Sequence, residues 1–216
     1  AMRNACSPRG FEVFEGHRGR IIPQPTTNHG PFAAAVGADI LREDQPDVMF
    51  IHLVELDSAR HMYGPTGPHV NTALETIDQR LGVLLAGLDD SGYAEQTNII
   101  IVSDHGQLET IQHTNLNILF RDRGFLRTDA DNNLLDWDIY LHSSGLSGQI
   151  FMQEGLSAQR LRAIEDLLEA IVAEPNYRIR EILSAAKARK RYGLDGPFSW
   201  VVESEPGVIV GGAFIG

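Results

Sequence analysis

Two short apolar runs on either side of a long helix constrain this chain more than any other feature. Residues 47–54 (Asp-Val-Met-Phe-Ile-His-Leu-Val) and 97–102 (Thr-Asn-Ile-Ile-Ile-Val) are almost entirely apolar, which is typical of strands buried on both faces. Between them, residues 68–88 place leucine and isoleucine at helical spacing. A strand, a helix and a second strand predict a right-handed βαβ unit with parallel strands. We therefore expect an α/β fold.

An aspartate and a histidine follow each apolar run. Asp57 and His61 are four residues apart, so on a helical turn they share a face. Asp104 and His105 are adjacent, and they can share a ligand only where the backbone turns, as Gly106 permits. Carboxylate and neutral imidazole are ligands of zinc, or of manganese where carboxylates dominate. Because parallel strands end at one edge of a sheet, we expect one metal centre there.

The remainder of the chain predicts a single domain after an irregular lead. Residues 1–31 are rich in Pro and Gly and show little periodicity, so we expect irregular chain there and one domain over 32–216. A helix is expected over 32–43. The later elements expected are a short helix over 116–123, strands over 138–142 and 149–153, helices over 158–173 and 181–191, and a closing hairpin of 198–203 with 208–211.

Charge and hydropathy exclude some classes of partner. The formal net charge is -11, which argues against binding the backbone of a nucleic-acid polymer. No apolar run approaches the roughly 20 residues that span a bilayer, and the N-terminus has no apolar signal region. We expect a soluble chain with no membrane partner, and the single Cys6 leaves the compartment open.

The motif residues resemble a known family. The pattern Asp57-x-x-x-His61-x-x-Gly64-Pro65, followed by a long helix and by Ile99-Ile-Ile-Val-Ser-Asp104-His105-Gly106, resembles the type I phosphodiesterase/nucleotide pyrophosphatase branch of the alkaline phosphatase superfamily. The resemblance is strong over residues 32–125. Arg60 stands where Gly is usual, and Gln107 stands where Met often follows. The resemblance implies a three-layer core with a largely parallel sheet, here incomplete.

This resemblance also implies a reaction and a cofactor. Asp57 and His61 would bind one divalent metal ion and Asp104 and His105 a second, with zinc expected and manganese as the alternative. Such an enzyme hydrolyses phosphodiester or pyrophosphate bonds of a small phosphorylated substrate. A Ser or Thr hydroxyl attacks phosphorus, and two metals stabilise the attacking and leaving oxygens.

The nucleophile is expected upstream of this segment. The family places it on an earlier strand and helix, whereas Thr26 and Thr27 lie in proline-rich chain without a preceding strand. The family's third ligand to the first metal is a late His, which is not found before Gly216. We therefore expect part of a catalytic domain, with weak metal binding and little activity of its own. An exposed apolar sheet edge would favour self-association.

Two other readings stay open. The first is another branch of the same superfamily, namely phosphonoacetate hydrolase, a phosphomonoesterase or a phosphomutase. Ser103 and the Gly64-Pro65 pair fit the diesterase branch better. The second is a catalytically incompetent fragment or binding module that keeps part of a metal site.

Overall fold

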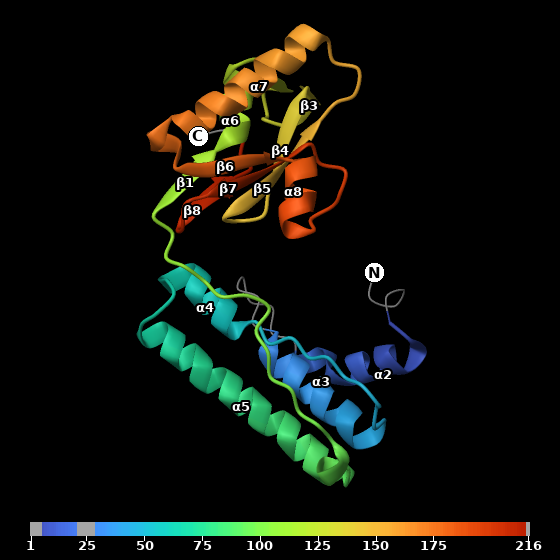
Figure 1. Ribbon diagram of the computed structural model, residues 1–216. Coiled ribbons are helices and arrows are strands. Elements are labelled where there is room, and N and C mark those ends of the chain that lie inside the picture. The colour runs from blue at the N-terminus through green and yellow to red at the C-terminus, as the bar shows by residue number, and fades with distance from the viewer. Residues whose placement is uncertain (1–5, 21–28, 215–216) are drawn as a thin grey trace. The chain divides into compact units, whose positions relative to one another are not determined.

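The computed structural model describes residues 6–20 and 29–214, which form two compact units (Figure 1). The N-terminal unit is Ala1–Gln107 and the C-terminal unit is Leu108–Gly216. The contacts of residues on either side of Gln107 stay largely within their own unit. Each unit is described separately.

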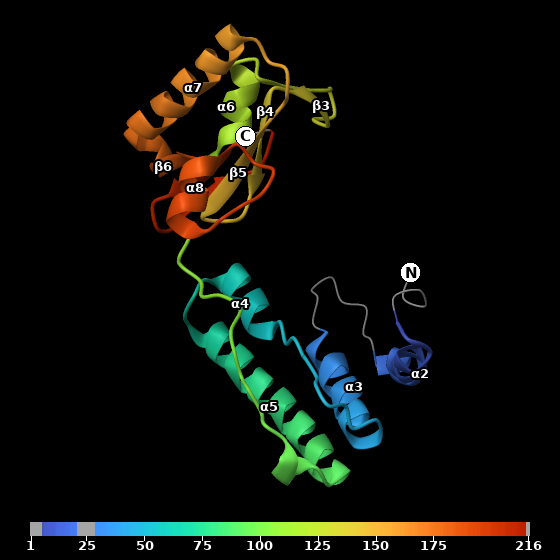
Figure 2. The same ribbon diagram turned by 45° about the vertical axis from the view of Figure 1, so that its right-hand side comes forward.

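Helices form most of the N-terminal unit. The predicted helices over 32–43 and 68–88 are confirmed as α3 (Gly30–Glu43) and α5 (Pro68–Ser91), and α4 (Glu55–Tyr63) lies between them in sequence. Helices α3 and α5 lie side by side (Figures 1 and 2). Their close approach depends on glycine, since Gly37 of α3 faces Leu84 of α5 and Gly87 of α5 faces Ala38 of α3.

The sequence predicts irregular chain over residues 1–31, and the structure differs, because part of this segment is helical. Residues Pro8–His17 form helix α2, followed by a 3-10 turn over Arg18–Arg20. The Ser7 side chain accepts the backbone N–H of Gly10 as an N-cap, and Pro8 takes the first turn, where its missing N–H costs nothing. His17 lies 2.5 Å from Asp39 of α3, which anchors α2. Thr26 and Thr27 lie outside the described residues.

The two apolar runs are not strands, which overturns the predicted βαβ unit. Residues 47–54 and 97–102 have no ladder partner among the described residues. In the first run, Met49 and Ile51 face α3 near Gly37, while Phe50 points outward and is 96% exposed. The second run is exposed along its whole length, with Ile100 80% and Val102 82% exposed. Their apolar composition predicts that both faces of each run are covered, and the described residues of the N-terminal unit do not cover both faces of either run.

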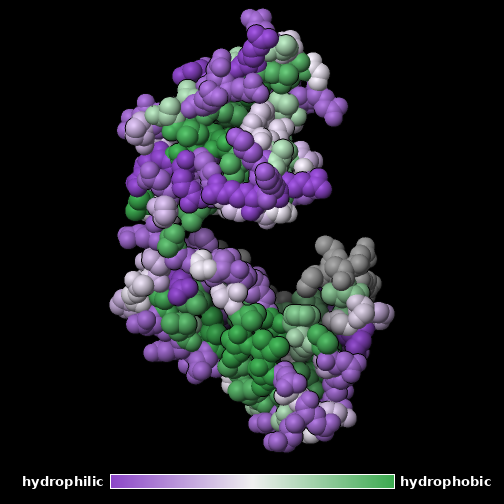
Figure 3. Space-filling view, viewed as in Figure 1, coloured by the Kyte–Doolittle hydropathy of each residue, from purple (hydrophilic) through white to green (hydrophobic). Residues whose placement is uncertain are grey.

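Exposed apolar side chains therefore gather on one face of the N-terminal unit. Figure 3 shows this hydrophobic surface over the region of α3 and α5. The large hydrophobic residues of the two runs that are exposed are Val48, Phe50, Ile99, Ile100, Ile101 and Val102.

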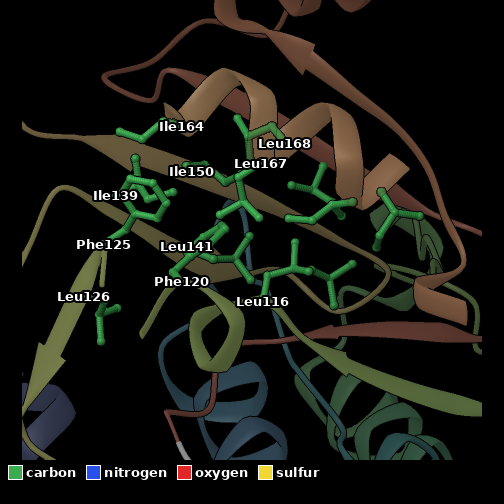
Figure 4. Packing of buried hydrophobic residues seen from close by; sticks show 14 residues of the cluster. Leu116, Phe120, Phe125, Leu126, Ile139, Leu141, Ile150, Ile164, Leu167 and Leu168 are labelled. Atoms are coloured by element: carbon green, nitrogen blue, oxygen red, sulfur yellow. The ribbon is translucent and has the colours of Figure 1, made fainter. Parts of the chain in front are cut away.

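A four-stranded antiparallel sheet organises the C-terminal unit. Its order is β4 (Ile139–Ser143), β5 (Ser147–Met152), β7 (Trp200–Ser204) and β6 (Ile179–Ser184). The strands predicted over 138–142 and 149–153 are confirmed as β4 and β5. Helices α6 (Leu116–Asp122) and α7 (Ala158–Ala173) are also confirmed, and their apolar faces pack with the sheet (Figure 4). The labelled core residues are Leu116, Phe120, Phe125, Leu126, Ile139, Leu141, Ile150, Ile164, Leu167 and Leu168.

Two elements of this unit differ from prediction. The helix expected over 181–191 is shorter, because β6 continues to Ser184 and the Ser184 side chain then caps α8 (Ala185–Tyr192). The prediction of a closing hairpin is wrong. Strand β7 pairs with β5 and β6, and β8 (Val208–Gly211) pairs in parallel with β1 (Gln112–Asn115). A short antiparallel pair, β2 (Leu126–Thr128) with β3 (Leu134–Trp137), completes the described strands.

The α/β class is confirmed, although the sheets are small. Within the described ranges, the parallel pairing is that of β1 with β8, and the larger sheet is antiparallel. The largely parallel sheet is therefore not formed by these residues, because the two segments expected at its centre remain unpaired.

Candidate metal centre

The first Asp–His pair lies on helix α4. The helix begins directly after the first apolar run and carries Asp57 in its first turn and His61 in its last. At this spacing the side chains meet, with His61 Nε2 3.3 Å from Asp57 Oδ1. Both side chains are accessible, His61 at 71% and Asp57 at 43% exposure. The predicted shared helical face is therefore present.

The second pair lies at a tight local turn after the second apolar run. Asp104 Oδ1 accepts the backbone N–H of His105 at 3.0 Å, and the Ser103 hydroxyl donates to the carbonyl of His105 at 2.6 Å. These bonds turn the chain so that His105 Nε2 lies 3.6 Å from Asp104 Oδ2. Adjacent residues thus present both side chains to one point, which a regular strand would prevent.

One ring nitrogen of His105 is fixed as a hydrogen-bond donor. Its Nδ1 lies 3.0 Å from the carbonyl oxygen of Gly106, and a carbonyl only accepts, so Nδ1 carries the proton. In the neutral ring Nε2 then keeps its lone pair, and it faces Asp104 Oδ2. A ring N–H donated to a backbone carbonyl is the usual support of a metal-ligating histidine.

In both pairs, the distance between the histidine nitrogen and the aspartate oxygen is compatible with a cation bound between them. These distances exceed the 2.7–3.2 Å of an N–H···O hydrogen bond, at 3.3 Å in the first pair and 3.6 Å in the second. Ligands about 2.1 Å from a tetrahedral zinc ion are about 3.4 Å apart. The donor types and their spacing therefore match two ligands of such an ion.

The number of donors is smaller than a complete site requires. Within residues 6–20 and 29–214, no three His, Cys, Asp or Glu side chains gather around one point. Catalytic zinc keeps three protein ligands, and each pair supplies two. Each pair therefore offers two of the three protein ligands that a catalytic zinc ion would need.

A hydrogen bond connects the two Asp–His pairs. Gln107 Nε2 donates to Asp57 Oδ1 at 3.1 Å, across 50 residues of sequence. Because Gln107 is two residues from His105, the two motifs lie close together in the N-terminal unit. The shared sheet edge that the sequence predicts is not what brings them together; a side-chain contact and helix α4 do so.

Arg60 was not predicted as a functional residue. It lies at i+3 from Asp57 and therefore on a neighbouring part of the same helical surface. Its Nε atom is buried and has no hydrogen-bond partner among the described residues. The signal in the sequence is the arginine itself, at a position where the resembling motif has glycine.

A buried carboxylate supports helix α4 from beneath. Glu55 has a side chain only 7% exposed, with Oε1 3.5 Å from Arg80 Nε of α5. Gly30, at the start of α3, leaves room for this carboxylate, because a Cβ there would lie 1.6 Å from Glu55 Oε1. The carboxylate thus fixes α4 against both neighbouring helices.

Comparison with known families now identifies the chain. A sequence profile described as Type I phosphodiesterase / nucleotide pyrophosphatase matches residues 12–203. The chain belongs to this family. The match includes all four proposed metal ligands and extends across both units.

Individual relatives align with a shorter stretch. Ectonucleotide pyrophosphatase/phosphodiesterase family member 3 of Bos taurus is 36% identical over 72 residues, which is 33% of this chain and 8% of that protein. Venom phosphodiesterase 2 of Crotalus adamanteus is 32% identical over 71 residues, 33% of this chain and 9% of that protein. The chain thus spans under a tenth of these relatives' length.

A solved structure shares the fold. Phosphonoacetate hydrolase from Sinorhizobium meliloti 1021, in complex with phosphonoacetate, superposes with a TM-score of 0.60 at 18% sequence identity. The match covers 97% of this chain and 48% of that one. This likeness supports an alkaline-phosphatase-like fold.

Among the helices described here, none has the length and apolar character of a membrane span.

Proposed function

We propose that this chain is part of a metal-dependent hydrolase that cleaves phosphodiester or pyrophosphate bonds in a small substrate. The observation that carries the proposal is the pair of Asp–His contacts, at 3.3 and 3.6 Å, in a chain of the phosphodiesterase family. The fold similarity alone would equally suit a phosphonate hydrolase, a monoesterase or a mutase.

The four ligands have separate roles in this proposal. Asp57 and His61 would hold one divalent cation, and Asp104 and His105 the other, with zinc preferred and manganese as the alternative. When bound, the cations polarise the phosphoryl group and offset negative charge on the attacking and leaving oxygens. The Gly106 carbonyl keeps the His105 proton on Nδ1, so that Nε2 is free to bind.

Arg60 would supply a further positive charge to the substrate. Its guanidinium has no carboxylate partner within 4.0 Å in the described part of the chain, although acidic residues outnumber basic ones. Arginine binds phosphoryl oxygens through paired N–H donors. The nucleophile is proposed to be a Ser or Thr that precedes this segment in the parent protein, where it would be activated beside the metals.

The 216-residue chain is proposed to be inactive by itself. Two protein ligands for each cation bind weakly, so cation sites would be partly filled at best. The competing function, a binding module that keeps part of a metal site, makes the same prediction for the isolated chain. The two readings separate only in the parent protein.

The parent enzyme therefore provides the test. Asp104→Asn and His105→Ala should lower the rate of phosphoryl transfer by several orders of magnitude, and Asp57→Asn should also be severe. A role outside direct metal binding would cost only about 10- to 100-fold. A panel of phosphodiesters, phosphomonoesters and phosphonates would identify the reaction. Normal turnover by metal-replete Asp104→Asn enzyme would refute the assignment.

We also propose that the isolated chain self-associates. The exposed apolar surface formed by the two runs has no strand partner among the described residues, and it carries β-branched side chains. Such segments pair readily with a second copy. The predicted contact is therefore between these runs.

A further inference from the structure

We infer that Gln107 is a positioning residue that holds the Asp57 carboxylate in the orientation needed for cation binding. The hydrogen bond from Gln107 Nε2 to Asp57 Oδ1, at 3.1 Å, comes from the segment that also carries Asp104 and His105. An ionised carboxylate only accepts hydrogen bonds, so the amide nitrogen, not the amide oxygen, must face Asp57. Its donor role is therefore assigned by chemistry.

The local surroundings give this bond its importance. The Asp57 side chain is 43% exposed and lies in the first turn of α4, so the helix by itself leaves this side chain free to change rotamer. The same oxygen that accepts from Gln107 lies 3.3 Å from His61 Nε2. Gln107 thus holds Asp57 Oδ1 on the side of the helix where this oxygen and the His61 imidazole can bind the same ion.

Gln107 also makes the Asp57–His61 pair depend on the conformation of the Asp104–His105 turn. The Ser103, Asp104 and His105 bonds set the turn that precedes Gln107. Because the Gln107 side chain extends from that turn to Asp57, a change in the turn would also change the position of the Asp57 carboxylate. The consequence is asymmetric: removal of the amide should weaken the Asp57–His61 pair and leave the Asp104–His105 pair intact.

The test compares Gln107→Met with Gln79→Met in the 216-residue chain. Methionine keeps the length of the side chain but cannot donate, and Gln79 is an exposed glutamine of α5. Zn²⁺ is titrated while the imidazole NMR signals of His61 and His105 are followed separately. Gln107→Met should lower the Zn²⁺ affinity measured at His61 about 10- to 100-fold, as loss of the residue that supports a metal ligand does elsewhere. The Zn²⁺ affinity measured at His105 should stay the same in this variant, and Gln79→Met should change the affinity at neither histidine.

A second measurement needs no metal. Side-chain scalar couplings of Asp57 should report one χ1 rotamer in the wild type and averaged rotamers in Gln107→Met. Equal weakening at both histidines would indicate general loosening, and an unchanged Asp57 rotamer would remove the positioning role; either result overturns the inference. The Zn²⁺ part rests on the proposed function. If neither wild-type imidazole responds to Zn²⁺, the metal assignment fails, and the rotamer result alone decides the role of Gln107.

Discussion

Gly87 of α5 packs directly on Ala38 of α3. A methyl group at Gly87 would lie 2.7 Å from both the Cα and the carbonyl oxygen of Ala38. Both atoms belong to the backbone of α3, so no side chain can rotate away to make room. The crossing of these two helices, which supports α4 and its Asp–His pair, therefore requires glycine at this position.

Gly87→Ala should destabilise the N-terminal unit. Overpacking of a tight contact typically costs about 1–3 kcal/mol, which outweighs the gain of about 1 kcal/mol in helix propensity. Gly82→Ala is the matched control on the same helix, since nothing lies within 4 Å of its added Cβ, and it should be neutral or stabilising. Amide hydrogen exchange of α5 would measure both changes. Equal protection in the two variants would contradict the prediction.

Asn117 should be essential to the C-terminal unit. Its fully buried side chain accepts the N–H of Leu141 at 2.8 Å and donates to the carbonyls of Leu141 and Gly212, both at 3.0 Å. In Asn117→Asp a carboxylate would face those two carbonyls without a proton to donate. We expect a loss of about 3 kcal/mol or more.

Urea unfolding followed by the fluorescence of Trp137 and Trp200 would measure this loss, since both tryptophans pack against the core of this unit. Asn132→Asp offers a comparison, because no side-chain hydrogen bond of Asn132 occurs within the described ranges and its left-handed backbone, at φ 63°, also tolerates aspartate. Similar midpoints for the two variants would show that the Asn117 network contributes little.

The anchoring of α2 should depend on pH through Asp39. Burial by itself raises the pKa of Asp39, but hydrogen bonds from His17 and Arg42 outweigh burial and hold that pKa below its ordinary value of 3.8. The folded state thus favours the ionised carboxylate. Its contribution to stability is present above the ordinary pKa and is lost as the pH falls through the lowered one.

Asp39→Asn should therefore lower the midpoint of thermal unfolding of the N-terminal unit at pH 7, and the difference from the wild type should shrink at pH values below the lowered pKa of Asp39. Helical circular dichroism recorded on both proteins across this range would provide the comparison. A difference that stays constant with pH would mean that the ionised pair is not its source.

Self-association should depend on the second apolar run. Ile100→Asp places a charge in the middle of that run, where pairing with another copy would bury it. Sedimentation velocity should show more monomer for this variant than for the wild type. Leu135→Asp is a fair control, because Leu135 of β3 is also exposed, at 63%, but is outside the run. An equal effect of both variants would implicate general solubility.

Local signals in the sequence predicted helices well. The amphipathic pattern of residues 158–173 coincides with α7, and the periodic residues 68–88 fall within α5. Such patterns depend on neighbouring residues only. The adjacency of the two Asp–His motifs was also predicted, although the sheet edge expected to create it is absent from the described residues.

Pairing between distant segments was harder to predict. The partner of β8 is β1, far away in sequence, while a hairpin with β7 was the simpler expectation. Apolar runs 47–54 and 97–102 show the same limit, because hydrophobicity predicts that a segment needs cover and not which segment supplies it. Arg60 and Gln107 lay outside any periodic pattern, so only their departures from the resembling motif marked them.

The closeness of each Asp–His pair in sequence has a thermodynamic consequence. Asp104 and His105 are neighbours, and Asp57 and His61 need only one helical turn. An unfolded chain retains much of this proximity, so it should also bind zinc to some extent. A ligand that binds both folded and unfolded states stabilises the fold less than its affinity suggests. Zinc should therefore shift the melting temperature of this chain only slightly, even at concentrations that fill both pairs.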